Sequence, residues 1–223
     1  MNINQISHMK QADKLLEYHN LNRGAFCEHL ALRAYRAIKW LYRAEDLEND
    51  SDMQFIAYWI AFNAAYAREI KLGDSFSEIH SYKSFLDKIL ELDVNSTIQK
   101  IVVSDYHNAI RVLLNNKYIY APFWEYINDS NNHDWESSFK KKNIQVLENI
   151  MSGDMVSGLN TIFSRLYTLR NQIVHGGSTW NSSKNRQQLK DANNILSKIL
   201  PEILMLMMKN PHEFQDKTNY PPV

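Results

Sequence analysis

The scarcity of glycine and proline constrains the fold of this chain more than any other sequence feature. Its 223 residues include six glycines and five prolines, where average composition would give roughly 16 and 11. Many short strands or glycine-rich phosphate loops need more turn-forming residues than these. A β-sandwich, a dinucleotide-binding doubly wound domain and a P-loop enzyme are therefore not expected, and long helices are favoured.

Charge and cysteine content narrow the possible partners and the expected compartment. Lys and Arg together number 25, as do Asp and Glu, so a nucleic acid would have to be held by a local basic patch. The single cysteine, Cys27, excludes an intramolecular disulfide and fits a reducing cytoplasm. The first ten residues contain no apolar signal core. The apolar stretch 199–208 is short and includes Pro201 and Glu202, so no membrane span is expected.

Hydrophobic periodicity predicts an all-α protein, a helical bundle built from long amphipathic segments. The segment 53–70 is apolar almost all round and is expected to be the buried central helix. The aromatic stretch 118–127 is ambiguous, and the last helix is expected to kink at Pro201. We expect an N-terminal helical arm over 1–22, one helical domain over 23–210 and a C-terminal tail over 211–223, frayed from Asp216 onward. The predicted helices cover 26–47, 53–70, 76–91, 96–114, 134–152, 155–176 and 183–209.

The helix expected over 155–176 separates apolar residues from polar ones. One apolar stripe should face the core. Asn171 and His175 are four residues apart, so they share the opposite face. Arg170 lies at the edge between the two faces, and Gly176-Gly177 lets the chain leave the helix at once. The stripe consists of Leu159, Ile162, Leu166, Leu169 and Ile173.

The string LRNQIVHGG, over 169–177, resembles the motif of the HEPN superfamily, in particular its Apea-like branch. That motif is an arginine, then four to six residues of which the first is polar, and then a histidine. Here it reads Arg170, Asn171 and His175. WIAFNAAY, over 59–66, is similar to the central helix of the branch, and the resemblance covers about 24–209.

The resemblance implies a HEPN-type bundle with several extra helices, and a function. Many members of the superfamily are metal-independent endoribonucleases of toxin–antitoxin, CRISPR-associated and phage-defence systems, and other members have lost catalysis. Members typically form homodimers in which the two motifs face each other. The expectation is a homodimeric toxin or antiviral defence effector that cleaves RNA, uses no cofactor or metal and has a cognate antitoxin as a further partner.

The chemistry of RNA cleavage supports the same assignment of residues. RNA carries its own nucleophile, the 2′-hydroxyl, so cleavage needs a base, an acid and a cation that stabilises the phosphorane. A histidine exchanges protons near neutral pH, and an arginine stays charged and binds phosphate oxygens in pairs. Asn171 would orient His175 or donate to the substrate. Because each chain supplies one such histidine, a two-fold dimer would bring two to one cleft.

Other residues admit competing interpretations. A second pair, Arg23 and His29, also has a spacing that the motif allows, with five residues between them. This pair lacks the polar residue directly after the arginine, because Gly24 is in that position. Asn63, alone among apolar residues, is expected to satisfy a core network, with support of the motif helix as the alternative. A non-catalytic helical module that binds a nucleotide, an RNA or a partner protein is the competing function. A face that would track RNA with cations and an aromatic ring is formed by Arg33, Arg36, Lys39, Trp40 and Arg43.

Overall fold

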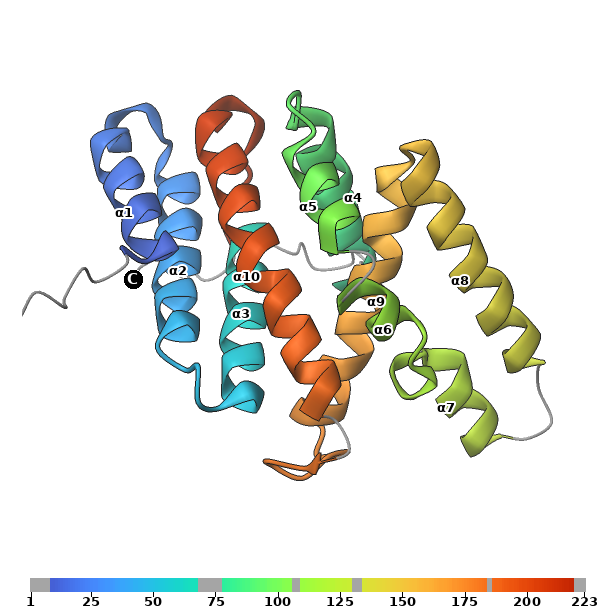
Figure 1. The fold of residues 1–223 in the computed structure, drawn as a ribbon. Helices are drawn as coiled ribbons and strands as arrows, with labels where there is room; N and C mark the ends of the chain where they lie inside the picture. Colours follow the sequence, from blue (N-terminus) through green and yellow to red (C-terminus); the bar gives the residue numbers. More distant parts are fainter. Residues whose placement is uncertain (1–8, 68–77, 106–108, 130–133, 184–185, 219–223) are drawn as a thin grey trace, which may run out of the picture.

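A computed structural model describes residues 9–67, 78–105, 109–129, 134–183 and 186–218. Within these ranges every regular element is a helix, which confirms the all-α prediction (Figure 1). Three short 3-10 turns, η1 (Arg23–Ala25), η3 (Lys117–Ile119) and η5 (Pro211–Glu213), connect or follow the α-helices. The α-helices are α1 (Gln11–Leu21), α2 (Glu28–Glu45), α3 (Ser51–Tyr66), α4 (Glu78–Leu92), α5 (Thr97–Asp105), α6 (Arg111–Leu114), α7 (Ala121–Asn128), α8 (Trp135–Ser152), α9 (Met155–Val174) and α10 (Arg186–Lys209).

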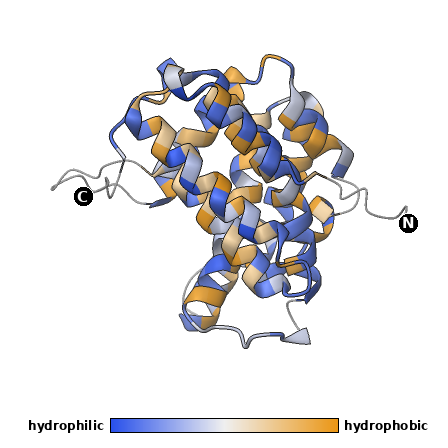
Figure 2. Cartoon of the chain, turned by 90° about the vertical axis from the view of Figure 1, so that its left-hand side faces the viewer, coloured by the Kyte–Doolittle hydropathy of each residue, from blue (hydrophilic) through white to orange (hydrophobic). Residues whose placement is uncertain are grey.

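Helix α3 is the central element, as its apolar sequence predicts. It packs against α2, α10, α4 and α9, and buried apolar side chains of these helices belong to one core cluster. Hydrophobic and hydrophilic residues follow one another along the helices of the bundle (Figure 2). Phe62 is fully buried, with its ring centre 4.6 Å from that of Phe163 on α9 and 5.6 Å from that of Trp59. Burying such large rings supplies much of the hydrophobic stabilisation of the bundle. The same contacts fix where α9 lies.

The two ends of the chain contribute to the core as far as the structure describes them. Ala12 and Leu15 of α1 are buried in the same hydrophobic cluster as α2 and α3, so the helical arm expected over 1–22 is part of the bundle from α1 onward. The expectation of fraying from Asp216 onward is wrong at Thr218, while Asp216 and Lys217 are exposed. Phe214 is buried against Phe85 at 6.0 Å between ring centres, and Thr218 is also buried. Burial of the apolar Phe214 ring stabilises the packing of this part of the tail against the bundle.

Helix boundaries depart from the sequence prediction where the chain turns. Of the helix expected over 96–114, the structure describes α5 and α6, and the prediction for 106–108 lies outside the described residues. The ambiguous aromatic stretch forms η3 and α7, with Pro122 in the first turn of α7, where its missing N–H is tolerated. Pro201 lies inside α10, and the kink expected there stays a prediction.

The residues that position α9 are ones that the sequence identifies. Gly153 ends α8 with a φ of 87°, in the left-handed region. Asp154 then caps α9 by accepting a hydrogen bond from the Ser157 N–H over 3.1 Å. Gly176 ends the helix with a φ of 73°. These signals set α9 between two sharp turns, so the motif falls at its C-terminal end.

No helix in the described part of the chain is both long and apolar enough to cross a membrane.

Candidate active site at the end of helix α9

The predicted stripe and the predicted polar face of α9 are both present. Leu159, Ile162, Leu166 and Leu169 are fully buried, and Ile173 packs against the core from its edge. Arg170 and Asn171 are partly exposed, and His175 is exposed at the C-cap. The motif side chains are therefore accessible to a substrate, while the helix that carries them is fixed by its buried side.

Arg170 is held in place by its neighbours in sequence and in space. Its Nη1 donates to Oδ1 of Asn171 over 2.9 Å, and its Nη2 lies 3.7 Å from Oε1 of Glu78 on α4. Its guanidinium carbon also lies 5.8 Å from the ring centre of Tyr167. A guanidinium held on three sides needs little reorganisation to meet a phosphate, although Glu78 competes for it.

Glu78 is the centre of a polar cluster that the sequence does not reveal. Tyr66 and Tyr167 each donate their hydroxyl to it, over 3.2 Å in both cases. Burial, and then the Glu78 carboxylate, raise the pKa of both phenols, so they remain donors over a wide pH range. Glu78 comes from a different helix and lies 92 residues before Arg170, so no local spacing could indicate it.

Asn63 belongs to this cluster. It is partly exposed rather than buried, and its Oδ1 accepts from the Tyr66 hydroxyl over 2.8 Å. Through Tyr66 it is connected to Glu78 and hence to Arg170. Asn63 therefore takes part in a polar network at the edge of the core, and its support of the motif helix stays a prediction.

His175 lies where the chain turns away from the helix. No side-chain hydrogen bond within the described residues fixes its ring, and Asn171 accepts from Arg170 rather than orienting the imidazole. The loop that follows is attached to the N-terminal end of α3. Trp180 donates to Asp50 over 3.1 Å, and Arg186 pairs with Asp52 at 2.8 Å. The backbone on both sides of His175 is thus anchored while the ring stays open to solvent.

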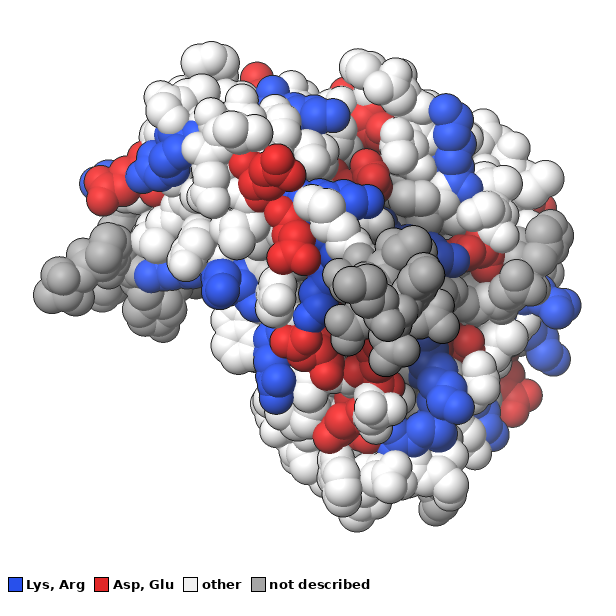
Figure 3. All heavy atoms as spheres, turned by 60° about the vertical axis from the view of Figure 1, so that its left-hand side comes forward, with Lys and Arg blue, Asp and Glu red and all other residues white. Residues whose placement is uncertain are grey.

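The predicted RNA-tracking face of α2 is only partly present. Arg33 is 3% exposed, and its Nε and Nη2 both donate to the Ala65 carbonyl, over 3.0 and 2.6 Å. The prediction that Arg33 lies on an exposed face is therefore wrong, because its guanidinium caps the C-terminal end of α3. Arg36 is partly exposed, and Lys39, Trp40 and Arg43 are exposed. On the side that carries α1 and α2, basic and acidic side chains are interspersed rather than gathered in one patch (Figure 3).

The competing pair of Arg23 and His29 is not arranged like the motif. Arg23 is exposed in η1, and its Nη1 donates to the Phe26 carbonyl over 3.4 Å. Nδ1 of His29 accepts from the Thr218 N–H over 3.4 Å. His29 is thus partly covered by the C-terminal tail, which makes it a poor site for a large substrate.

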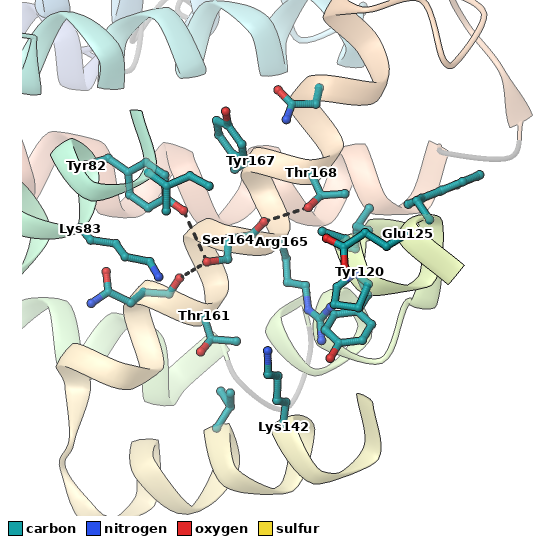
Figure 4. A pocket seen from close by; sticks show the side chains of 18 of the residues that line it. Tyr82, Lys83, Tyr120, Glu125, Lys142, Thr161, Ser164, Arg165, Tyr167 and Thr168 are labelled. Carbon is teal, nitrogen blue, oxygen red and sulfur yellow. Dashed lines mark hydrogen bonds between the residues drawn. The ribbon is translucent and has the colours of Figure 1, made fainter. Parts of the chain in front are cut away.

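A groove of about 820 Å³ adjoins the motif, and the sequence analysis missed it. It is bounded by α4, η3, α7, α8 and α9, and we call it the lateral groove. Asn171 and Gln172 of the motif line one part of it, and Arg165, Lys83 and Lys142 line the rest (Figure 4). Gln172 also donates to the Tyr118 carbonyl, which ties the motif to η3. The consecutive helices α7, α8 and α9 form this groove together with α4, which comes earlier in the chain, so only the tertiary structure shows it.

Neither metal ligands nor known proteins assign the site a function. Within the described residues, no three His, Cys, Asp or Glu side chains are grouped so that they could hold a metal ion. Comparison of the chain with protein-family models, curated proteins and solved structures gives no match. The functional argument therefore rests on the residues and their geometry.

Proposed function

We propose that this chain is a metal-independent endoribonuclease of the HEPN type, which cleaves RNA by attack of the 2′-hydroxyl. The observation that carries the proposal is the arrangement at the end of α9. An exposed His175 lies one helical turn from Asn171, and Asn171 accepts a hydrogen bond from an already oriented Arg170. The resemblance of the string over 169–177 to the HEPN motif supports the same assignment.

The proposed reaction needs only these groups and the RNA. A His175 imidazole removes the proton from the 2′-hydroxyl, and the 2′-oxygen attacks the adjacent phosphorus. Arg170 stabilises the charge on the phosphorane oxygens. The bond to the 5′-oxygen then breaks, and a second imidazole, in the protonated form, gives that oxygen a proton. The products are a 2′,3′-cyclic phosphate and a 5′-hydroxyl.

The proposal includes a homodimer, because one chain supplies one motif histidine. Two exposed apolar side chains lie next to the motif histidine in sequence: Val174, directly before it, is 52% exposed, and Trp180, in the loop after it, is 71% exposed. Such side chains are suited to burial against a second copy around a two-fold axis. In the dimer the His175 rings of the two chains share the base and acid roles.

The biological setting is part of the same proposal. A toxin or phage-defence effector in the cytoplasm, with a cognate antitoxin, is what the resemblance implies. The lone Cys27, which is free in the structure, is compatible with a reducing compartment. Arg36, Lys39, Trp40 and Arg43 remain a predicted RNA-contacting face.

The experiment that tests the proposal is an RNA digest in excess chelator with analysis of the product ends. We expect cleavage to persist and to leave 2′,3′-cyclic or 3′-phosphates and 5′-hydroxyls. Loss of activity in chelator, or 5′-phosphate ends, would contradict the mechanism. If a well-folded dimer cleaves no RNA, the non-catalytic module that binds a nucleotide, an RNA or a partner protein becomes the better account.

A further inference from the structure

Arg165 is a buried cation in the wall of the lateral groove. It is 2% exposed, and its guanidinium carbon lies 4.2 Å from the ring centre of Tyr120. Nη2 donates to Oδ1 of Asn143 over 3.1 Å, whereas Nε has no hydrogen-bond partner. No ion pair between described residues includes Arg165. Burial lowers the pKa of Arg165 to about 10, as expected for a buried charge without a countercharge.

Two lysines face the same groove from other helices. Lys83 comes from α4, and Lys142 comes from α8, with its Nζ 5.6 Å from the ring centre of Tyr120 (Figure 4). Neither lysine forms an ion pair with a carboxylate in the described part of the chain. Glu125 is the one acidic side chain among the described residues that line the groove. The groove therefore has an excess of positive charge in a molecule whose formal net charge is zero.

Groups that could receive a nucleobase lie beside these cations. Trp124 lines the groove, and its ring is fixed because Nε1 donates to the Tyr118 carbonyl over 2.7 Å. Asn160 also lines the groove, with its amide nitrogen donating to Asp87 over 2.9 Å and its Oδ1 buried without a partner. An aromatic face accepts a stacked base. A vacant amide oxygen accepts a hydrogen bond from an exocyclic amine.

We propose that the lateral groove binds a nucleotide of single-stranded RNA at a distance from the cleaved bond, with the phosphate near Arg165, Lys83 and Lys142 and the base near Trp124. This inference rests on the proposed function, because it assumes that the bound nucleotide is part of the RNA substrate. Arg165 is ten residues before His175, or ~15 Å along α9. Because stacked nucleotides repeat every ~3.4 Å and extended ones are further apart, the subsite lies about two to four nucleotides from the scissile phosphate.

The test is binding of a fluorescent 2′-O-methyl oligoribonucleotide of about eight nucleotides to the full chain, because this probe cannot be cleaved. We expect Lys83→Gln and Lys142→Gln each to weaken binding about fivefold at moderate salt. Each should also lower the slope of log Kd against log salt by about 0.7, the value for one contact with a single strand. Lys141→Gln is the matched control, since Lys141 is exposed on α8 but does not line the groove.

Two further measurements distinguish RNA from a free mononucleotide as the ligand, and distinguish failure of the groove proposal from failure of the proposed function. Arg165→Met should weaken the probe at least tenfold while circular dichroism reports a folded protein. Adenosine 5′-monophosphate at millimolar concentration should compete poorly, and tight binding of this mononucleotide would overturn RNA as the source.

Equal effects of Lys141→Gln and Lys142→Gln on binding would overturn the proposal that the groove binds RNA. If the probe binds as expected but RNA is not cleaved, the proposed function fails and the groove stands. If RNA is cleaved and the groove variants bind normally, only the groove fails.

Discussion

At the scale of single residues, His175 and Arg170 should be essential for cleavage and dispensable for folding. His175 is exposed and Arg170 is partly exposed, so neither supports the core. We expect His175→Ala and Arg170→Ala to lower the cleavage rate at least about 100-fold, the usual size of acid–base and electrostatic contributions. Unfolding in urea should show losses of no more than about 1 kcal/mol. His29→Ala should cleave normally, and an essential His29 with a dispensable His175 would mean that the wrong pair has been identified.

Glu78 should act as a positioning residue, because it touches Arg170 rather than the substrate. Glu78→Gln keeps the shape of the side chain and one acceptor oxygen, enough for either Tyr66 or Tyr167, and it removes the charge that pairs with Arg170. We expect kcat/KM to fall about tenfold, with little change in thermal stability. In an Arg170→Lys background the same substitution should have a much smaller effect, since the two residues act as a unit. Glu91→Gln, at an exposed position of α4, is the control; equal losses from both variants would remove Glu78 from the account.

The motif residues could be identified from sequence, but their partners could not. Arg170, Asn171 and His175 lie within six consecutive residues, so helical spacing alone places them together. Glu78 and Lys142 reach the site from other helices, and their positions depend on how the helices pack. Arg33 shows the opposite error. Helical spacing put it on a basic face, but its guanidinium is buried and donates to the Ala65 carbonyl near the end of α3.

At the scale of elements, the turn at Gly176 should control both the end of α9 and the position of His175. Gly176 has a φ of 73°, and its N–H donates to the Ile173 carbonyl over 3.2 Å. We expect Gly176→Ala to reduce the free energy of unfolding by about 1 kcal/mol, because a side chain is strained in the left-handed region. The rate of RNA cleavage should also fall, because the same turn positions His175. Gly24→Ala is the control, since a Cβ at that position meets nothing within 4 Å. Equal stability of the two variants in chemical denaturation would contradict this assignment.

Helix ends and helix interiors were predictable to different degrees. Asp134, Gly153, Asp154 and Gly176 are residue types that favour helix ends, and the structure has a helix begin or end at each of them. The packing of Phe214 against Phe85 has no local signal, because it depends on a residue that is distant in sequence. The lateral groove belongs to the same class of features, which only tertiary packing creates.

At the scale of the whole molecule, the proposed site is complete only in a dimer. Light scattering at micromolar concentration should give twice the chain mass of 26.2 kDa. Val174→Asp should convert the dimer to a monomer and abolish cleavage, because it places a charge beside the motif. Val94→Asp should do neither. Val94 is 87% exposed and follows α4 at the opposite end of the bundle, since α4 runs antiparallel to α9. A wild-type monomer that does not associate with or without RNA would contradict the dimer.

The central claim is that the Arg170 and His175 pair cleaves RNA through the substrate's own 2′-hydroxyl. The most direct measurement uses an oligoribonucleotide that is cleaved at one mapped position and an identical one with a single 2′-deoxy sugar at that position, both in excess chelator. The account predicts a cyclic phosphate product from the first oligonucleotide and no cleavage at the deoxy position of the second. It also predicts that His175→Ala cleaves neither. Cleavage at the deoxy position by the wild-type protein would contradict the account.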